Sequence, residues 1–158
     1  MTILRIILLA MRLHGAYPQL DMADAMTHAE FAIAMATDQL SPEVVLGVAF
    51  VESRFDPRAT SRPRRARAWG FCGVMQTIAE SRSDCIRQRD LGVGYALGVQ
   101  EISWWLANAR VRGNLRRALL GHGCGLPGLR LGWCGDHYAD RVLGFARKLG
   151  ARLQARRP

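Results

Sequence analysis

One glutamate follows a hydrophobic run at a position where its carboxyl group would be buried. Residues 44–51 are all apolar or glycine, and Glu52 comes directly after them. At about 100° per residue along a helix, Glu52 falls beside Val45 and Val48 rather than on the solvent side. Burial raises the pKa of a carboxyl group toward neutrality, which a general acid working near pH 7 requires. Alternatively, Glu52 could form an ion pair with a buried arginine, or its side chain could reach solvent past the end of the helix.

Four cysteines form a second group of reactive side chains, and their local pairing would be Cys72–Cys85 and Cys124–Cys134. This pairing would close two short loops, each worth about 2–3 kcal/mol if unstrained. It would also indicate an oxidising compartment. Free buried thiols are one alternative. A zinc site from Cys124, Cys134, His122 and His137 is another, but its spacing is not a common finger pattern, so we expect disulfides and no metal.

The composition indicates one globular domain with a basic surface. The chain has 158 residues, of which 49% are hydrophobic and 22% charged, and its net charge is +9. Such a charge favours binding to polyanions: nucleic acid, anionic lipid or acidic polymers of a bacterial wall. No apolar run approaches the roughly 18 residues needed to span a membrane. Arg5 and Arg12 interrupt the hydrophobic N-terminus, which favours an amphipathic first helix over a signal peptide.

Hydrophobic spacing predicts a series of helices. One helical face carries Met22, Met26, Ala29 and Ile33, which we expect in the core. A second helix is predicted from the Ser41-Pro42 start to about Phe55. A third, at about 93–110, has its apolar stripe at Tyr95, Val99, Ile102 and Leu106.

The C-terminal third is predicted to contain two more helices. A short one spans about 114–121 and is followed by a glycine-rich loop. The last begins near Asp136 and ends in a frayed tail at 152–158. Because no segment alternates with period two, we predict a mostly α fold with little or no β-structure.

Four segments resemble one family. Residues 52–61, ESRFDPRATS, resemble the E-S-x-F-x-P-x-A-x-S signature of soluble lytic transglycosylases, which belong to the lysozyme superfamily. Residues 70–78, GFCGVMQTI, are similar to that family's G-L-M-Q-I segment. Residues 118–125 and 138–143 sit where the family has A-L-x-x-Y-N-A-G and Y-V-x-x-V-L. The four segments lie in the family's order and cover about 40–145, so residues 1–158 are interpreted as a single lysozyme-like catalytic domain.

The resemblance implies cleavage of the β-1,4 bond between N-acetylmuramic acid and N-acetylglucosamine in peptidoglycan. Glu52 would be the single catalytic acid and then the base, closing a 1,6-anhydro ring without consuming water. Ser53 would orient the glutamate, Met75 and Gln76 would line the glycan groove, and Tyr138 would face Glu52. Each of these four also has a structural alternative. Ser53 could be an ordinary residue at a helix end, and Met75 could belong to the core. Gln76 could form a hydrogen bond within a loop, and Tyr138 could pack in the apolar stripe of the last helix. No cofactor is implied.

The third segment departs from the family pattern. His122 stands in the tyrosine position of Y-N-A-G, and Gly123 stands in the asparagine position. These positions help to bind sugar in the family. His122 could replace the tyrosine as a donor to the glycan, or it could be an ordinary loop histidine.

Two other functions fit the sequence. A goose-type lysozyme would hydrolyse the same bond and would need a second carboxylate about 6.5–9.5 Å away with a water between. The candidates for that carboxylate are Asp56, Glu80, Asp84 and Asp90. A non-enzymatic basic protein, binding the wall or assembling into a virion, is the second alternative. Nucleic-acid binding is not expected, since no groove-reading motif is present.

An arginine-rich segment raises the question of further partners. Its members are Arg58, Arg62, Arg64, Arg65 and Arg67. They could bind anionic wall polymers, or they could form a solvated loop. Because peptidoglycan lies outside the cytoplasm, the predicted location is extracytoplasmic, reached by secretion or as a phage lysis or virion component.

Overall fold

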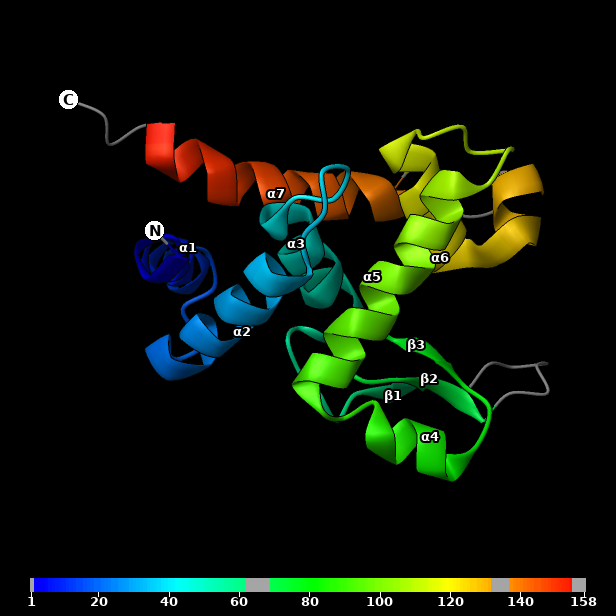
Figure 1. Ribbon diagram of the computed structural model, residues 1–158, viewed down its shortest axis with the longest axis horizontal. Helices are drawn as coiled ribbons and strands as arrows, with labels where there is room; N and C mark the ends of the chain where they lie inside the picture. The colour runs from blue at the N-terminus through cyan, green and yellow to red at the C-terminus, as the bar shows by residue number, and fades with distance from the viewer. Residues whose placement is uncertain (1, 62–68, 132–136, 155–158) are drawn as a thin grey trace.

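The computed structural model describes residues 2–61, 69–131 and 137–154. The helices are α1 (Thr2–Ala16), α2 (Met22–Met35), α3 (Pro42–Ser53), α4 (Arg82–Arg87), α5 (Leu91–Ala107), α6 (Leu115–Leu131) and α7 (His137–Gln154). The strands are β1 (Thr60–Ser61), β2 (Gly70–Cys72) and β3 (Thr77–Ala79), antiparallel in the order β1-β2-β3. This arrangement (Figure 1) confirms the predicted mostly α fold with little β-structure.

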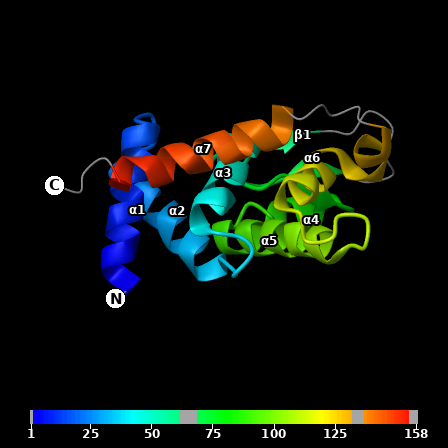
Figure 2. The same ribbon diagram turned by 90° about the horizontal axis from the view of Figure 1, so that it is seen from above.

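Helix α3 forms the centre of the core. It lies against α7 and α2 (Figure 1), and the view from above shows α7 again running across it (Figure 2). Its residues 44–49 are all buried, as their apolar character requires. Ser41 and Pro42 start the helix as predicted, but it ends at Ser53, slightly earlier than expected. Arg54 and Phe55 both have positive φ angles (58° and 69°), which turns the chain out of the helix.

The contact between α3 and α7 is unusually close because it involves a glycine. A Cβ atom at Gly47 would lie 2.7 Å from the backbone carbonyl oxygen of Val142. Real side chains do not approach a carbonyl so closely, so only glycine allows this separation of the two helices. The helix that carries Glu52 and the helix that carries Tyr138 therefore touch backbone to backbone.

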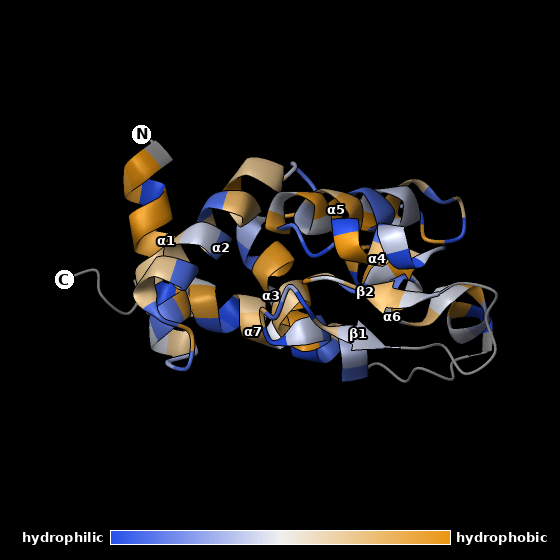
Figure 3. Cartoon of the chain, turned by 90° about the horizontal axis from the view of Figure 1, so that it is seen from below, coloured by the Kyte–Doolittle hydropathy of each residue, from blue (hydrophilic) through white to orange (hydrophobic). Residues whose placement is uncertain are grey.

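The first helix is amphipathic, as the sequence predicts. Leu9, Ala10 and Leu13 are buried against α2 and α7, whereas its N-terminal turns expose Ile3 and Leu4. Figure 3 shows the same turns coloured as hydrophobic. In the described part of the chain, no helix combines the length and apolar character needed to cross a membrane.

The core face of α2 differs from the predicted one. Met22 and Met26 are 41% and 42% exposed, while Ala25, Ala29 and Ala32 are completely buried. The prediction for the methionines was therefore wrong. Small alanines let the neighbouring helices pack closely, and the longer methionines lie at the edge of that contact.

Residues 121–131 of the glycine-rich segment predicted to be a loop are helical instead, and the rest of that segment lies outside the described residues. Helix α6 continues to Leu131 and is interrupted only at Gly125, whose φ and ψ are 64° and −174°. A φ of this sign suits glycine. Pro127 follows two residues later, where a new helical turn can start without its missing N–H. The described part of this segment therefore consists of two helical stretches separated by a break at Gly125.

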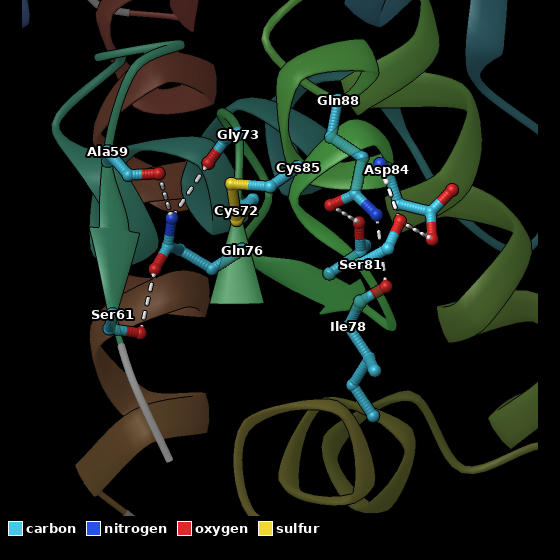
Figure 4. Close-up of a disulfide and its surroundings, with 11 residues drawn as sticks. Ala59, Ser61, Cys72, Gly73, Gln76, Ile78, Ser81, Asp84, Cys85 and Gln88 are labelled. Atoms are coloured by element: carbon cyan, nitrogen blue, oxygen red, sulfur yellow. Dashed lines mark hydrogen bonds between the residues drawn. A yellow bond between two sulfur atoms is a disulfide. The ribbon is translucent and has the colours of Figure 1, made fainter. Parts of the chain in front are cut away.

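A disulfide joins the small sheet to α4. Cys72 of β2 and Cys85 of α4 are bonded, with an S–S distance of 2.05 Å (Figure 4). Beside it, the Gln88 side chain accepts a hydrogen bond from Thr77 and donates one to the Ile78 carbonyl. Cys124 is also disulfide-bonded. Cys134, its expected partner, lies outside the described residues.

Removing the Cys72–Cys85 bond should lower stability measurably. The bond closes a loop with a sequence separation of 13, and loops of this length are worth about 3 kcal/mol through restriction of the unfolded chain. We therefore expect a Cys72→Ala/Cys85→Ala variant to unfold at lower denaturant concentration than the wild type, under oxidising conditions for both. An unchanged midpoint would show that packing around Gln88 alone holds the sheet on α4.

Candidate active site

Glu52 lies in the last turn of α3 and points toward the start of α7. Its side chain is 19% exposed, so it is largely buried and still reachable from solvent. Tyr138, in the first turn of α7, donates a hydrogen bond from its hydroxyl to Glu52 Oε1 at 2.5 Å. The structure therefore brings together the two residues that the sequence placed on either side of a site.

His122 and Glu101 complete the group around Glu52. His122 Nε2 lies 3.8 Å from Glu52 Oε1, and His122 Nδ1 lies 3.3 Å from Glu101 Oε2. The imidazole side chain is only 2% exposed, and neither of its nitrogens meets hydrogen-bond geometry with any described residue. Two carboxylates from α3 and α5 therefore flank one buried imidazole from α6.

This environment favours the protonated form of Glu52. Burial is the largest influence and raises the pKa of the Glu52 carboxyl above its usual range; the nearby His122 and the Tyr138 hydrogen bond lower it, and Glu101 raises it. Arg141 has the weakest influence, and no arginine among the described residues forms an ion pair with Glu52. The arginine-paired alternative therefore does not hold for the described residues.

Tyr138 is held as a hydrogen-bond donor. Burial first, and then the neighbouring Glu52, raise the pKa of its phenol well above the usual value, so it keeps its proton. Its position depends on Gly123, because a Cβ atom there would lie 2.9 Å from the Tyr138 ring. The glycine in the asparagine position of the family pattern is thus the residue that lets the tyrosine reach Glu52.

Ser53 connects the end of α3 to the turn that follows β2. Its hydroxyl lies 3.0 Å from the carbonyl of Ala49 and 2.8 Å from that of Val74, and either can accept its hydrogen bond. Val74 belongs to the turn between β2 and β3. Ser53 therefore fixes the end of α3 against that turn, a structural contact that would keep Glu52 in place.

Met75 and Gln76 take structural positions in that same turn. Met75 is completely buried in the core, which is the alternative to its predicted place in a groove. The Gln76 amide donates to the carbonyls of Ala59 and Gly73, and its oxygen accepts from Ser61 (Figure 4). Gln76 therefore ties β1 to the turn, and its φ of 49° shows that the backbone there is held in a rarely populated conformation.

An open groove adjoins the Glu101 side of the site. It has a volume of about 500 Å³ and is lined by Thr77, Ile78, Leu97, Gln100, Glu101, Trp104 and Trp105. Trp104 is 56% exposed, which is unusual for so large an apolar ring. An exposed aromatic face beside carboxylate and amide groups can pack on the C–H face of a sugar ring while the polar groups bind its hydroxyls.

Glu101 is the site residue that the sequence reading missed. It lies within the helix predicted at 93–110, where a charged residue is normally taken as solvent-facing. The available signal was its spacing: Leu97, Glu101 and Trp105 are four residues apart and share one helical face. Four carboxylates were proposed from sequence. Asp56 and Asp90 accept hydrogen bonds from local backbone N–H groups, and Asp84 accepts from the Ser81 hydroxyl and the Arg87 guanidinium. Glu80 is exposed.

The zinc alternative is not supported. Cys124 is engaged in a disulfide and cannot supply a thiolate, and both His122 nitrogens face carboxylates. Among residues 2–61, 69–131 and 137–154, no cluster of three or more potential metal ligands is present.

A comparison with known protein families identifies the family of the chain. The model described as "Transglycosylase SLT domain" matches residues 30–108, half of the chain. The chain belongs to this family, which acts on peptidoglycan, a substrate outside the cytoplasm. The match includes Glu52 and Glu101 and stops before His122 and Tyr138. Comparisons with curated proteins and with solved structures gave no significant match.

Proposed function

We propose that this protein is a peptidoglycan lytic transglycosylase in which Glu52 is the single catalytic acid and base. The observation that carries the proposal is the placement of Glu52: largely buried, in contact with Tyr138 and His122, and paired with no arginine among the described residues. Such surroundings raise the pKa of a carboxyl group, which is what a proton donor to a leaving oxygen requires.

The geometry suggests which oxygen carries the proton. Oε1 accepts the hydrogen bond from Tyr138 and faces His122, so Oε2 is the oxygen left for substrate. In the proposed first step, Oε2 protonates the glycosidic oxygen and the bond from muramyl C1 to that oxygen breaks. N-acetylglucosamine leaves with the proton, and positive charge develops at C1.

The second step would return the proton to Glu52. The resulting carboxylate takes the proton of the muramyl C6 hydroxyl while the C6 oxygen bonds to C1, forming the 1,6-anhydro ring. Atoms balance without water. Between the steps Glu52 is a buried anion, which the Tyr138 hydroxyl and the nearby imidazole would stabilise.

Substrate contacts would extend along the groove beside Glu101, with the exposed Trp104 ring as a platform for sugar. Of the arginines suggested to bind anionic wall polymers, Arg58 is exposed and the other four lie outside the described residues. Action outside the cytoplasm, by secretion or as part of a phage, belongs to the same proposal.

One observation favours a second candidate, a muramidase that hydrolyses the same bond. Glu101 is a second carboxylate, separated from Glu52 by the His122 ring. If a water molecule were held by Glu101, it could attack C1 in place of the C6 hydroxyl. The two reactions differ in their products by one water.

Product analysis separates these candidates. We expect purified peptidoglycan digested by the wild-type protein in H₂¹⁸O to release muropeptides with 1,6-anhydromuramic ends, which gain no ¹⁸O and resist borohydride reduction. Mass spectrometry reads both properties. Reducible, ¹⁸O-labelled ends would instead establish the hydrolase. No release from several wall types would leave the non-enzymatic wall-binding protein as the better description.

A further inference from the structure

The proposed reaction leaves Glu101 without a role, although it lies against the buried His122 imidazole. Its Oε2 lies 3.3 Å from His122 Nδ1, on the side of the imidazole opposite to Glu52. By strict geometry neither imidazole nitrogen forms a hydrogen bond, and besides the two carboxylates the Met75 backbone also influences the ring. A buried polar ring normally has polar partners, and here the two carboxylates, together with the Met75 backbone, compensate its burial.

We propose that Glu101 is a positioning residue of the cleavage reaction, which holds the His122 ring with a proton on Nδ1 and its Nε2 edge against Glu52. This inference rests on the proposed function and extends it to a residue outside the family's sequence motifs quoted above. Glu101 acts through His122, so it is not itself a catalytic residue.

The first argument concerns orientation. An imidazole ring can turn about its bond to Cβ, and a carboxylate at Nδ1 fixes both its angle and its tautomer. Carboxylate–imidazole pairs in enzymes use this arrangement to aim Nε2 at a reacting group. Here Nε2 is aimed at Glu52 Oε1, the oxygen that also accepts the Tyr138 hydrogen bond.

The second argument concerns charge. If His122 is protonated, Glu101 balances it while Glu52 is neutral, and the group of three carries no net charge before the reaction. After Glu52 donates its proton, the imidazolium lies beside the new carboxylate and stabilises it. Burial lowers the pKa of His122, but the carboxylates of Glu101 and then Glu52, with the Met75 backbone after them, outweigh burial and raise the pKa overall.

The remaining charged and titratable groups around Glu52 come from α7. Tyr138 stays protonated, and Arg141 acts only weakly on Glu52. Neither group is among the influences on the His122 pKa, whereas Glu101 Oε2 lies 3.3 Å from its Nδ1. The protonation of His122 therefore depends mainly on α5, and a substitution at Glu101 tests that dependence directly.

A double-mutant cycle tests the role in catalysis. We expect Glu101→Gln to lower kcat about tenfold or more with a smaller change in KM, and to have little further effect in a His122→Gln background. Glu30→Gln, an exposed carboxylate on α2, is the matched control and should leave kcat unchanged. Wild-type kcat in Glu101→Gln, or losses that multiply in the double variant, would overturn the inference.

Titration of His122 by NMR provides a readout that does not depend on activity. We expect its midpoint to lie above the usual histidine range in the wild type and to fall in Glu101→Gln, because the neutral amide no longer supports the imidazolium. An unchanged midpoint would overturn the inference. Failure of the proposed function would look different: Glu52→Gln would keep its activity, whatever the behaviour of Glu101.

Discussion

A Glu52→Gln variant is expected to fold and to lose peptidoglycan cleavage by about a thousandfold or more, since a positioned proton donor contributes roughly 10²–10⁴ and this one would serve in both steps. Glutamine has almost the same shape, and its amide oxygen can still accept the Tyr138 hydrogen bond at the position of Oε1. The measurement is the initial rate of muropeptide release. Activity within tenfold of the wild type would remove Glu52 from the mechanism.

The same variant is expected to be more stable than the wild type at neutral pH. The pKa of the Glu52 carboxyl is raised in the folded protein by burial. Stability therefore falls as pH rises from the ordinary carboxyl range through the raised value, because the folded state must give up a proton that the unfolded state has already lost. Glutamine does not titrate, so the variant avoids this loss of stability. Denaturant unfolding at several pH values should show that the difference in free energy of unfolding between Glu52→Gln and the wild type disappears in acid. A difference that does not change with pH would contradict the predicted direction.

The second large effect is expected from Gly123→Asn, which restores the residue of the family pattern. A Cβ atom at this position would lie 2.9 Å from the Tyr138 ring, so the ring has to move away from Glu52. Losing a hydrogen bond to a charged group costs about 1.5–3 kcal/mol. We therefore expect kcat to fall roughly ten- to a hundredfold.

Two comparisons make that experiment specific. Gly150→Ala on α7 is the control, because a Cβ atom there meets nothing within 4 Å. Tyr138→Phe should reproduce most of the loss, and adding Gly123→Asn to it should change little more. If Gly123→Asn were as active as the wild type, the glycine would have no part in placing Tyr138.

The sequence was sufficient to predict the structure of residues whose placement depends on a local pattern. The apolar run before Glu52 predicted both its helix and its burial, and the short separation of Cys72 and Cys85 predicted their bond. Helical spacing also placed Tyr95 and Ile102 in the core, where both are completely buried. In each case the pattern lies within one short stretch of the chain, as with the sequence separation of 13 between Cys72 and Cys85.

Other features depend on contacts between distant segments and could not be predicted in this way. Whether Glu101 faces solvent or His122 depends on how α5 packs on α6. The exposure of Met22 and Met26 depends on alanines that allow α2 to pack closely on its neighbours. Residues 122–131 are helical despite their high glycine content. Gly125 accommodates the break in the helix, and tertiary packing overrides the low helix propensity of the other glycines.

The backbone contact at Gly47 has a consequence for how the site can move. Since nothing but hydrogen lies between α3 and the Val142 carbonyl, these two helices have no soft side-chain layer through which to slide. Glu52 and Tyr138 would then fluctuate together as parts of one rigid unit. Glu101 and Trp104 belong to α5, which packs mainly on α6 and α2 rather than on α3. Any widening of the site to admit a bulky glycan strand would therefore change the distance from Glu52 to α5 while its hydrogen bond to Tyr138 stayed constant.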